Sequence, residues 1–345
     1  MKALLGQTYN EILQIINSLN APAFTAKQIC DWIYNKGVYS IEDMTNLSLK
    51  IRENLSLSYT IGITPYIKEV ISKDGTRKYL FCYDDSIFVE AVLIFDRQRT
   101  TLCISTQAGC KMNCEFCATG KQGFARNLTS NEIINIYKVL NNRCLESDIK
   151  QQISNIVFMG MGEPLDNWQE VQKTLDILTS SWGYGLSPRR ITVSSCGYLP
   201  TIKEFLDSSQ VDLAISLHNA INKERIEIMP IEKAYPIKEV VNLLRQYDWK
   251  GQRQLTFEYI VFKNLNDTNS HINALAKLLN GLACKINLIP FNTIPNTRFV
   301  ATHREELEIF ANKLRIKGFN VRIRQSKGED ISAACGLLST KEQKL

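Results

Sequence analysis

The sequence lacks the features that mark several large classes of protein. It contains no run of eighteen apolar residues and no basic stretch leading into an apolar block at its N-terminus, so it predicts neither a membrane span nor a secretion signal. Low-complexity tracts are also missing, and 44% hydrophobic residues beside 22% charged residues exclude a disordered or fibrous chain. We therefore expect a globular protein of the cytosol without a membrane anchor.

A large excess of charge of one sign is missing as well. The net charge of +6 permits a polyanionic partner such as RNA but is too small to establish one. Cysteine, by contrast, is plentiful. Ten cysteines in a chain without a secretion signal indicate metal or redox chemistry rather than a disulfide framework.

The length of 345 residues predicts one large domain with a small appendage. In residues 1–62, apolar residues recur at helical spacing, which predicts a helical accessory domain. Residues 63–95 form extended runs around an Asp74-Gly75 turn and predict a β-rich connector. The remaining residues, 96–345, are expected to form the catalytic domain.

In this last region predicted strands and helices alternate, which favours an α/β fold with parallel strands joined by helical crossovers. Thr129 and Glu132 form a candidate capping box that opens a helix reaching to about residue 142. About six βα units are predicted, fewer than the eight of a closed barrel, so we expect a partial barrel with its chemistry on the loops after the strands. The strands are expected at 155–159, 191–195, 211–216, 255–262, 285–289 and 320–324, and the helices at 168–180 and near 201, 237, 273 and 304.

Three cysteines lie close together in the segment CKMNCEFC, directly after a predicted strand. Cys110, Cys114 and Cys117 can hold three irons of a [4Fe–4S] cluster and leave the fourth iron open for another ligand. A structural zinc ion is the rival reading, but it requires four closed ligands, and the nearest histidine in the sequence, His218, is about a hundred residues away. The third reading is a chance grouping of buried cysteines.

This Cys-x3-Cys-x2-Cys spacing, with the aromatic Phe116 before the third cysteine, resembles the radical S-adenosylmethionine (SAM) superfamily. The resemblance implies that SAM binds the open iron and that one electron from the cluster cleaves it to methionine and a 5′-deoxyadenosyl radical. The protein then positions and shields this chemistry.

Further motifs extend the resemblance over nearly the whole chain. QAGCKMNCEFCATGKQGFARNLTSNEI, VFMGMGEPLDNW, SPRRITVSSCG, ISLHNA, NLIPFN and DISAACG, in this order, are similar to the RlmN/Cfr family of RNA adenine methyltransferases, and FTAKQICDWIYNKG is similar to its helical accessory domain. The family implies methylation of adenine carbon 2 in 23S ribosomal RNA (adenosine 2503) and in a subset of transfer RNAs (adenosine 37). It also implies a monomer that receives electrons from a flavodoxin or ferredoxin.

The resemblance assigns catalytic roles to three residues. Cys335 matches the cysteine that one SAM methylates, Cys103 matches the cysteine that releases the RNA adduct through a transient disulfide, and Glu90, at the end of an extended run from Ile87, matches a carboxylate that handles protons. Without the family, Cys335 is an ordinary buried cysteine, Cys103 faces the core by strand periodicity, and Glu90 is solvated. The other cysteines, expected to be structural, are Cys30, Cys82, Cys144, Cys196 and Cys284.

The implied route explains the need for a radical. Carbon 2 of adenine is electrophilic, so it cannot attack the methyl group of SAM as an amine does. The methyl group of Cys335 instead loses a hydrogen atom to the radical from a second SAM, adds to the base, and is released when Cys103 and Cys335 form a disulfide.

The family's SAM contacts match positions that follow predicted strands, although glycines there can be simple turn formers and a histidine can be a satisfied core residue. These candidate positions are Gly162, Glu163, Ser194, Ser216, Leu217, His218 and Asn292. Cationic residues beside the loops or on the appendage are candidates for RNA phosphates or plain surface charges: Lys111, Lys121, Arg126, Arg189, Arg190, Lys27 and Lys36.

Two alternatives remain open. A family branch methylates carbon 8 instead and confers antibiotic resistance; Pro164 and the Pro290-Phe291-Asn292 stretch favour the carbon 2 branch, whereas Lys111 departs from that branch's usual proline. An RNA-binding protein with a structural metal is the alternative from another class.

Overall fold

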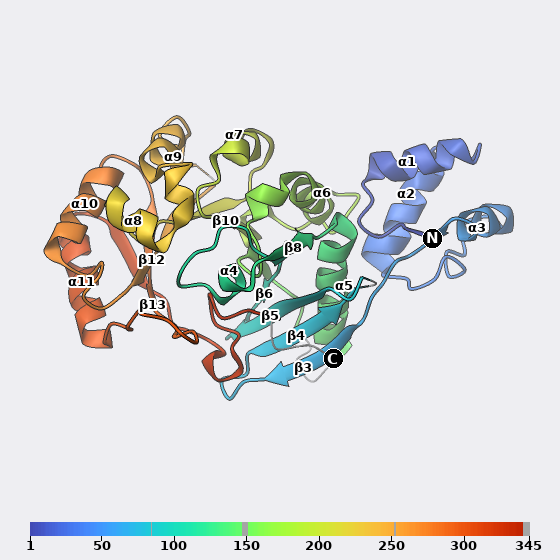
Figure 1. Ribbon diagram of the computed structural model, residues 1–345. Helices are drawn as coiled ribbons and strands as arrows, with labels where there is room; N and C mark the ends of the chain where they lie inside the picture. Colours follow the sequence, from blue (N-terminus) through green and yellow to red (C-terminus); the bar gives the residue numbers. More distant parts are fainter. Residues whose placement is uncertain (84, 147–150, 252, 341–345) are drawn as a thin grey trace.

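The computed structural model describes residues 1–345 except 84, 147–150, 252 and 341–345. At one end of the molecule, coloured blue in Figure 1, lies a helical region that a short parallel strand pair ties together. Thr8 and Glu11 form a reciprocal capping box at its first helix, and the predicted helical spacing is confirmed because Ile12 and Ile16 are fully buried. Its elements are β1 (Lys2–Ala3), α1 (Tyr9–Ser18), α2 (Phe24–Cys30), the π-helical turn η1 (Asp31–Lys36), α3 (Leu49–Ser56) and β2 (Tyr59–Thr60).

Four antiparallel strands follow and lead directly into the barrel. They are β3 (Tyr66–Ile71), β4 (Arg77–Cys82), β5 (Phe88–Asp96) and β6 (Arg99–Cys103). The predicted Asp74-Gly75 turn joins β3 to β4, where Gly75 has a φ of 85°. Because β6 pairs in parallel with the next barrel strand, the connector is the antiparallel edge of the barrel's own sheet.

The sheet has ten strands in the order β14-β13-β12-β11-β10-β9-β6-β5-β4-β3. All neighbours from β6 to β14 are parallel, which confirms the predicted partial barrel: the six predicted strands are β9 to β14, and β6 adds a seventh. The strands are β9 (Asn155–Phe158), β10 (Ile191–Ser195), β11 (Asp212–Ser216), β12 (Leu255–Val261), β13 (Lys285–Pro290) and β14 (Asn320–Ile323).

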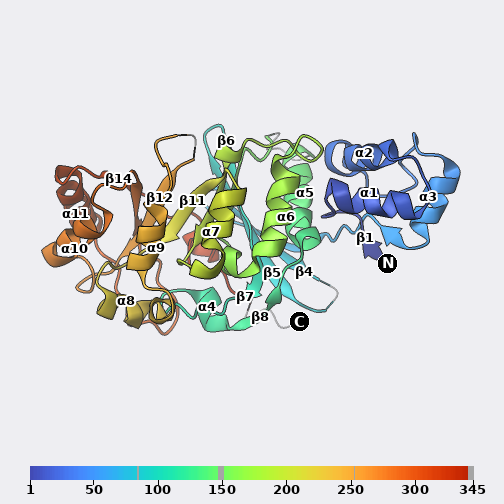
Figure 2. The ribbon, with the colours of Figure 1, turned by 90° about the horizontal axis from the view of Figure 1, so that it is seen from above.

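Helices cover the outer face of this sheet, as Figures 1 and 2 show. The Thr129–Glu132 capping box is confirmed: the Thr129 amide donates to the Glu132 carboxylate at 2.8 Å, and the Glu132 amide donates to the Thr129 hydroxyl at 3.3 Å. The helices are α5 (Ser130–Glu146), α6 (Trp168–Thr179), α7 (Leu199–Ser208), α9 (Ile237–Leu244), α10 (Asn269–Leu279) and α11 (Arg304–Ile316).

Short elements next to the loops were not predicted, because three to seven residues show too little periodicity. They matter for the site, since most of them shape the ends of the barrel strands. They are β7 (Gln107–Gly109), α4 (Ala118–Gln122), β8 (Phe124–Asn127), α8 (Asn222–Ile228) and the 3-10 turns η2 (Pro164–Asn167), η3 (Pro188–Arg190), η4 (Pro230–Lys233) and η5 (Glu329–Ile331).

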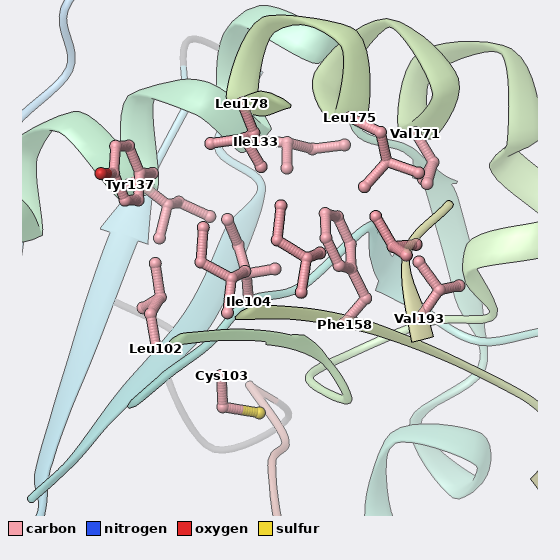
Figure 3. Packing of buried hydrophobic residues seen from close by; sticks show 14 of the residues in the cluster. Leu102, Cys103, Ile104, Ile133, Tyr137, Phe158, Val171, Leu175, Leu178 and Val193 are labelled. Atoms are coloured by element: carbon pink, nitrogen blue, oxygen red, sulfur yellow. The ribbon is translucent and has the colours of Figure 1, made fainter. Parts of the chain in front are cut away.

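The main core lies between the sheet and α5 and α6 (Figure 3). Leu102, Ile104 and Phe158 point toward these helices and are almost completely buried, which stabilises the fold by roughly 1.5–3 kcal/mol for each large side chain. Cys103 points to the opposite face of the same strand. Strand alternation therefore aims Cys103 into the barrel, whereas the sequence had suggested that it faces the core.

Residues 326–340, which we call the C-terminal strap, run from the last strand back across the connector. The Ser72 hydroxyl donates to Asp330 at 2.5 Å and the Gly328 amide donates to Asp74 at 3.1 Å. Further along, the Thr119 hydroxyl donates to the carbonyl of Leu338 at 2.6 Å. The strap thus joins the connector to the helix that follows the cysteine loop.

Candidate active site

A cavity of about 500 Å³ lies inside the barrel. Its walls come from the cysteine loop, the barrel strands and the strap, so segments far apart in the sequence meet there. Most of the predicted site residues line it, namely Cys103, Cys110, Cys114, Cys117, Gly162, Glu163, Ser194, Ser216, His218, Asn292 and Cys335. Leu217 and Glu90 are not among its lining residues.

The cysteine loop begins at a position that only glycine can occupy. Gly109 has a φ of 77°, and a side chain there would meet the carbonyl oxygen of Gly123 at 1.8 Å. This close approach lets the Cys110 amide donate to the same carbonyl at 2.9 Å and closes the loop. Phe116, the aromatic before the third cysteine, packs its ring edge-on against His218 with centroids 4.7 Å apart.

Burial raises the pKa of Cys110 to about 12 and that of Cys114 well above its usual value. These thiols therefore keep their protons unless metal ions replace them. Among the described residues, no three His, Cys, Asp or Glu side chains are closed around a single metal ion. Three thiols on one cavity wall, open on the cavity side, fit a larger iron–sulfur cluster with one free iron.

His218 is distant from the cysteine loop in the sequence but lies beside it in the fold, where its ring packs against Phe116. Its Nδ1 accepts a hydrogen bond from the Ile260 amide at 3.0 Å, which leaves the proton on Nε2. Burial and, secondarily, the charge of Arg225 lower the pKa of His218 to about 3. The imidazole is therefore neutral.

Glu163 is a buried carboxylate held by backbone amides. It accepts from the Leu165 amide at 3.1 Å and from the Cys196 amide at 2.8 Å. Burial raises its pKa, while these hydrogen bonds oppose that rise. Gly162 must be a glycine, because its φ is 101° and a side chain would come within 2.5 Å of Gln107. A carboxylate presented in this way suits an ammonium group.

The remaining predicted cofactor residues lie at the ends of three strands. Ser194 belongs to β10 and Ser216 ends β11. Leu217 is fully buried, its amide donates to the Glu258 carbonyl at 2.9 Å, and it is not among the residues that line the cavity. The Asn292 amide nitrogen donates to the carbonyl of Cys335 at 3.1 Å, so Asn292 also holds the strap.

An ion pair that the sequence did not reveal fixes these strand ends. Arg225 is fully buried and pairs with Glu232, which is 1% exposed. Its other nitrogens donate to the carbonyls of Cys196 at 3.0 Å, Ser216 at 2.9 Å and Leu217 at 3.0 Å. A single guanidinium therefore connects the ends of β10 and β11.

Cys103 and Cys335 approach the cavity from different walls, β6 and the strap. Burial raises the pKa of Cys103 to about 12, and the nearby Cys335 adds to that rise. Cys335 is exposed to the open cavity, yet the surrounding protein atoms desolvate it and raise its pKa. The positive charge of Arg324 lowers the pKa of both thiols. All ten cysteines are free thiols.

The position and burial of Glu90 differ from the prediction. It lies near the start of β5, not at a strand end, and it is fully buried rather than solvated. Its carboxylate pairs with Lys78 at 3.0 Å and accepts from the Ser339 amide at 3.0 Å. Burial raises the pKa of Glu90, although the contacts with Lys78 and Ser339 act to lower it. Glu90 therefore holds the strap through the backbone of Ser339.

The predicted phosphate contacts are corrected in part. Lys111 pairs with Asp166 at 2.9 Å and lies over the ring of Phe124, and Arg126 pairs with Asp85 and Glu132. Both cations thus have protein partners. Arg189 and Arg190 precede β10, at the opposite end of that strand from Ser194 and the cysteine loop, so they do not lie beside the predicted loops.

The cavity residues that the sequence does not single out include Cys196, Glu258 and Arg324. Cys196 had been assigned to the structural cysteines. Glu258 is the one with a detectable signal, because a carboxyl group in the apolar run LTFEYIV of a buried strand is expensive unless it has a purpose.

The barrel and its cysteine loop define a radical SAM enzyme. Residues 104–279 match the family model of the radical SAM superfamily, and residues 2–61 match that of the ribosomal RNA large subunit methyltransferase N-terminal domain. The crystal structure of a radical SAM methyltransferase from Sphaerobacter thermophilus superposes with a TM-score of 0.91 at 36% identity, covering 98% of this chain and 99% of that one.

The similarity to named relatives is closer still. A probable dual-specificity RNA methyltransferase RlmN from Bacteroides fragilis is 50% identical over 99% of this chain and 97% of its own length. The relative of that name from Clostridium perfringens is 41% identical over 98% of this chain and 96% of its own. The chain belongs to the RlmN family, and its cofactors are a [4Fe–4S] cluster and SAM. No helix among the described residues is long and apolar enough to cross a membrane.

Proposed function

We propose that this enzyme methylates carbon 2 of adenine in RNA, with Cys335 as the methyl carrier. The observation that supports this most directly is the meeting of Cys335, Cys103 and the three cysteines of the loop in one cavity. When bound, the cluster and SAM supply a methyl group, a 5′-deoxyadenosyl radical, and a donor and acceptor of one electron.

The protein residues have separate tasks in this proposal. Cys110, Cys114 and Cys117 hold the cluster, and Glu163, turned into the cavity by Gly162, binds the ammonium group of SAM. Ser194, Ser216, His218, Asn292 and the backbone of Leu217 complete the SAM site. The buried Arg225 keeps the ends of two of these strands at a fixed separation.

Cys335 takes the methyl group on its sulfur by displacement and gives up its thiol proton. The methyl group then loses one hydrogen atom, and the Cys335 methylene radical forms a carbon–carbon bond with adenine carbon 2. The thiolate of Cys103 attacks the sulfur of Cys335, so a disulfide forms and the carbon–sulfur bond breaks. For the balance to close, the released base gives up one electron, which the cluster would take when bound, carbon 2 loses its proton, and the methylene carbon gains a proton to become the methyl group.

Glu90 is proposed to support the proton transfers indirectly, by holding the strap that carries Cys335. Its carboxylate contacts Lys78 and Ser339, and Glu90 is not among the residues that line the cavity. A role in positioning Cys335 therefore fits the contacts better than direct contact with the base.

Nucleoside mass spectrometry of RNA treated with the reconstituted enzyme tests the reaction. We expect 2-methyladenosine, in keeping with Pro164 and the Pro290-Phe291-Asn292 stretch. A product of 8-methyladenosine would place the chain in the carbon 8 branch. No methylated base from an enzyme that still cleaves SAM would refute RNA methylation.

The partners are also proposals. The relatives' name, dual-specificity RNA methyltransferase, supports two kinds of RNA substrate, and the family model of residues 2–61 names ribosomal RNA of the large subunit. The proposed substrates are therefore 23S ribosomal RNA and transfer RNA, bound in part by an accessory domain over residues 1–62. The units 63–95 and 96–345 then form the connector and the catalytic domain. A flavodoxin or ferredoxin is the proposed electron donor, the protein is proposed to be a monomer, and its ten free thiols favour the reducing cytosol.

A further inference from the structure

Glu258 is a carboxyl group in the wall of the barrel with no role so far. It lies in β12 between Phe257 and Tyr259, both fully buried, while Glu258 and Ile260 line the cavity. Strand alternation thus turns the side chain of Glu258 inward. It is only 4% exposed, in the part of the sheet where its register partner is Ser216.

The contacts of Glu258 occupy one of its two oxygens. Oε1 accepts from the Asn287 amide group at 2.9 Å, and Arg324 lies 3.7 Å from the same atom. Oε2 is buried and has no hydrogen-bond partner among the described residues. An unpaired buried polar atom costs about 1–3 kcal/mol, and because Glu258 lines the cavity, a molecule bound there can supply the missing partner.

The surroundings of Glu258 identify the bound molecule. Its charge raises the pKa of Cys335, and Arg324, its ion-pair partner, lowers the pKa of both Cys335 and Cys103. The carboxyl group therefore lies within electrostatic reach of Cys335, and it lines the same cavity as Cys335 and Cys103, between which the base must be held. A group beside Cys335 and Cys103 is placed to contact the base that accepts the methyl group.

We propose that Glu258 reads the Watson–Crick edge of the target adenine, with Oε2 accepting a hydrogen bond from the 6-amino group. This inference rests on the proposed function. Adenine presents a donor at its 6-amino group and an acceptor at N1, and carbon 2 follows N1 on the same edge. A base held by this edge turns carbon 2 toward its neighbours in the cavity.

The electrostatics favour this assignment. Burial raises the pKa of Glu258 despite Arg324 and Asn287, so a hydrogen bond from the 6-amino group of adenine to Oε2 would lower the cost of burying this carboxylate. Guanine carries a carbonyl oxygen in place of the 6-amino group, so Oε2, which accepts, gains no hydrogen bond at that position.

The test compares RNA oligonucleotides that carry either adenosine or purine riboside, which lacks the 6-amino group, at the target position. For the wild type we expect kcat/KM to be about ten- to a hundredfold lower with purine riboside, the value of one buried hydrogen bond. In Glu258→Ala the ratio of kcat/KM with adenosine to kcat/KM with purine riboside should fall to less than about threefold. Glu258→Gln should keep most of it, because a glutamine amide pairs with the same edge. Glu204→Gln, exposed on α7, is the matched control with an unchanged ratio.

Two readouts without RNA separate the possible outcomes. Iron content and methylation of Cys335 show whether each variant is folded and loaded. An equal ratio in Glu258→Ala and the wild type overturns the inference, and so does a raised KM for SAM in methylation of Cys335, which would place SAM at Oε2. If Glu258→Ala loses its iron, Asn287→Ala takes its place in the test. This variant frees the carboxyl group to turn and should lower the ratio of kcat/KM with adenosine to kcat/KM with purine riboside. An unchanged ratio overturns the inference. Failure of the proposed function looks different, because the wild type then methylates neither oligonucleotide.

Discussion

The side chain of Cys103 points away from those of Leu102 and Ile104, and this single alternation decides what it can do. A thiol on the helix-facing side of β6 would be inert core. On the barrel side it shares a cavity with Cys335, although burial and the neighbouring thiol keep its proton on until an acceptor removes it.

Replacing Cys103 with Ala should therefore stop the reaction at the covalent adduct. Cys335 should still be methylated and should still attack the base, but no thiol is left to break the carbon–sulfur bond. A denaturing gel should show a protein band shifted by RNA and sensitive to ribonuclease. The double variant that also lacks Cys335 should show no such band, and normal turnover by Cys103→Ala would disprove the resolving role.

His218 makes the stability of the protein depend on pH. Its pKa is about 3 in the folded protein, against an ordinary value of 6.5. As the pH falls through 6.5 the unfolded chain therefore binds more protons than the folded protein does, and the free energy of unfolding decreases. Between pH 7.5 and 5.5 the loss attributable to this residue should be about 1.4 kcal/mol. Urea unfolding of the wild type and His218→Asn checks this, since Asn tolerates the φ of 53°. Identical pH slopes would contradict it.

At the scale of elements, the buried pair of Arg225 and Glu232 determines how α8 and η4 support the strand ends. Replacing Arg225 with Met should lower the free energy of unfolding by about 3–5 kcal/mol, because Glu232 is left buried without a partner. The double variant Arg225→Met/Glu232→Leu should recover much of this. Urea denaturation measures both, and Lys203→Met, which breaks an exposed pair on α7, should change little. A mild effect of Arg225→Met would show that water reaches the pair.

The long elements were predictable because their signals are strong. The capping box at Thr129 marked the start of α5, and only its end differed, at Glu146 instead of about residue 142, since Cys144 continues the buried face. The short elements around the site were missed because tertiary hydrogen bonds form them, such as the one from Cys110 to Gly123. Periodicity carries no information about such contacts.

In the site, too, residues within sequence motifs were predictable, whereas contacts between distant segments were not. Motifs placed the cysteine triplet, Glu163 and Cys335 in advance, and all of them line the cavity. They could not show that Glu90 lies under the strap, or that Arg324 reaches both Cys103 and Cys335, because these relations depend on how the strap crosses the connector. Pairings between distant segments exist only in the folded chain.

At the scale of the whole molecule, the strap closes the barrel and fixes the position of Cys335. Asp330 accepts from the Ser72 hydroxyl and from the Lys73 amide at 3.1 Å. Asp330→Ala should loosen the strap and slow methylation of Cys335 by about two- to tenfold, the value of one or two exposed hydrogen bonds. Hydrogen exchange of residues 328–340 should accelerate while exchange in the barrel strands stays unchanged. Glu329→Ala, at the exposed neighbouring position, is the control, and equal exchange in both variants would exclude Asp330 as an anchor.

The strap also imposes an order in time. About two hundred residues separate Cys117 from residue 326, so a ribosome adding about 5–20 residues per second completes the cysteine loop some 10–40 s before it reaches the strap. During that interval a nascent chain contains the proposed cluster ligands but not Cys335, the proposed methyl acceptor. Radical chemistry on the target base thus has to wait until the chain has been made through Cys335 and the strap has docked on strands synthesised long before.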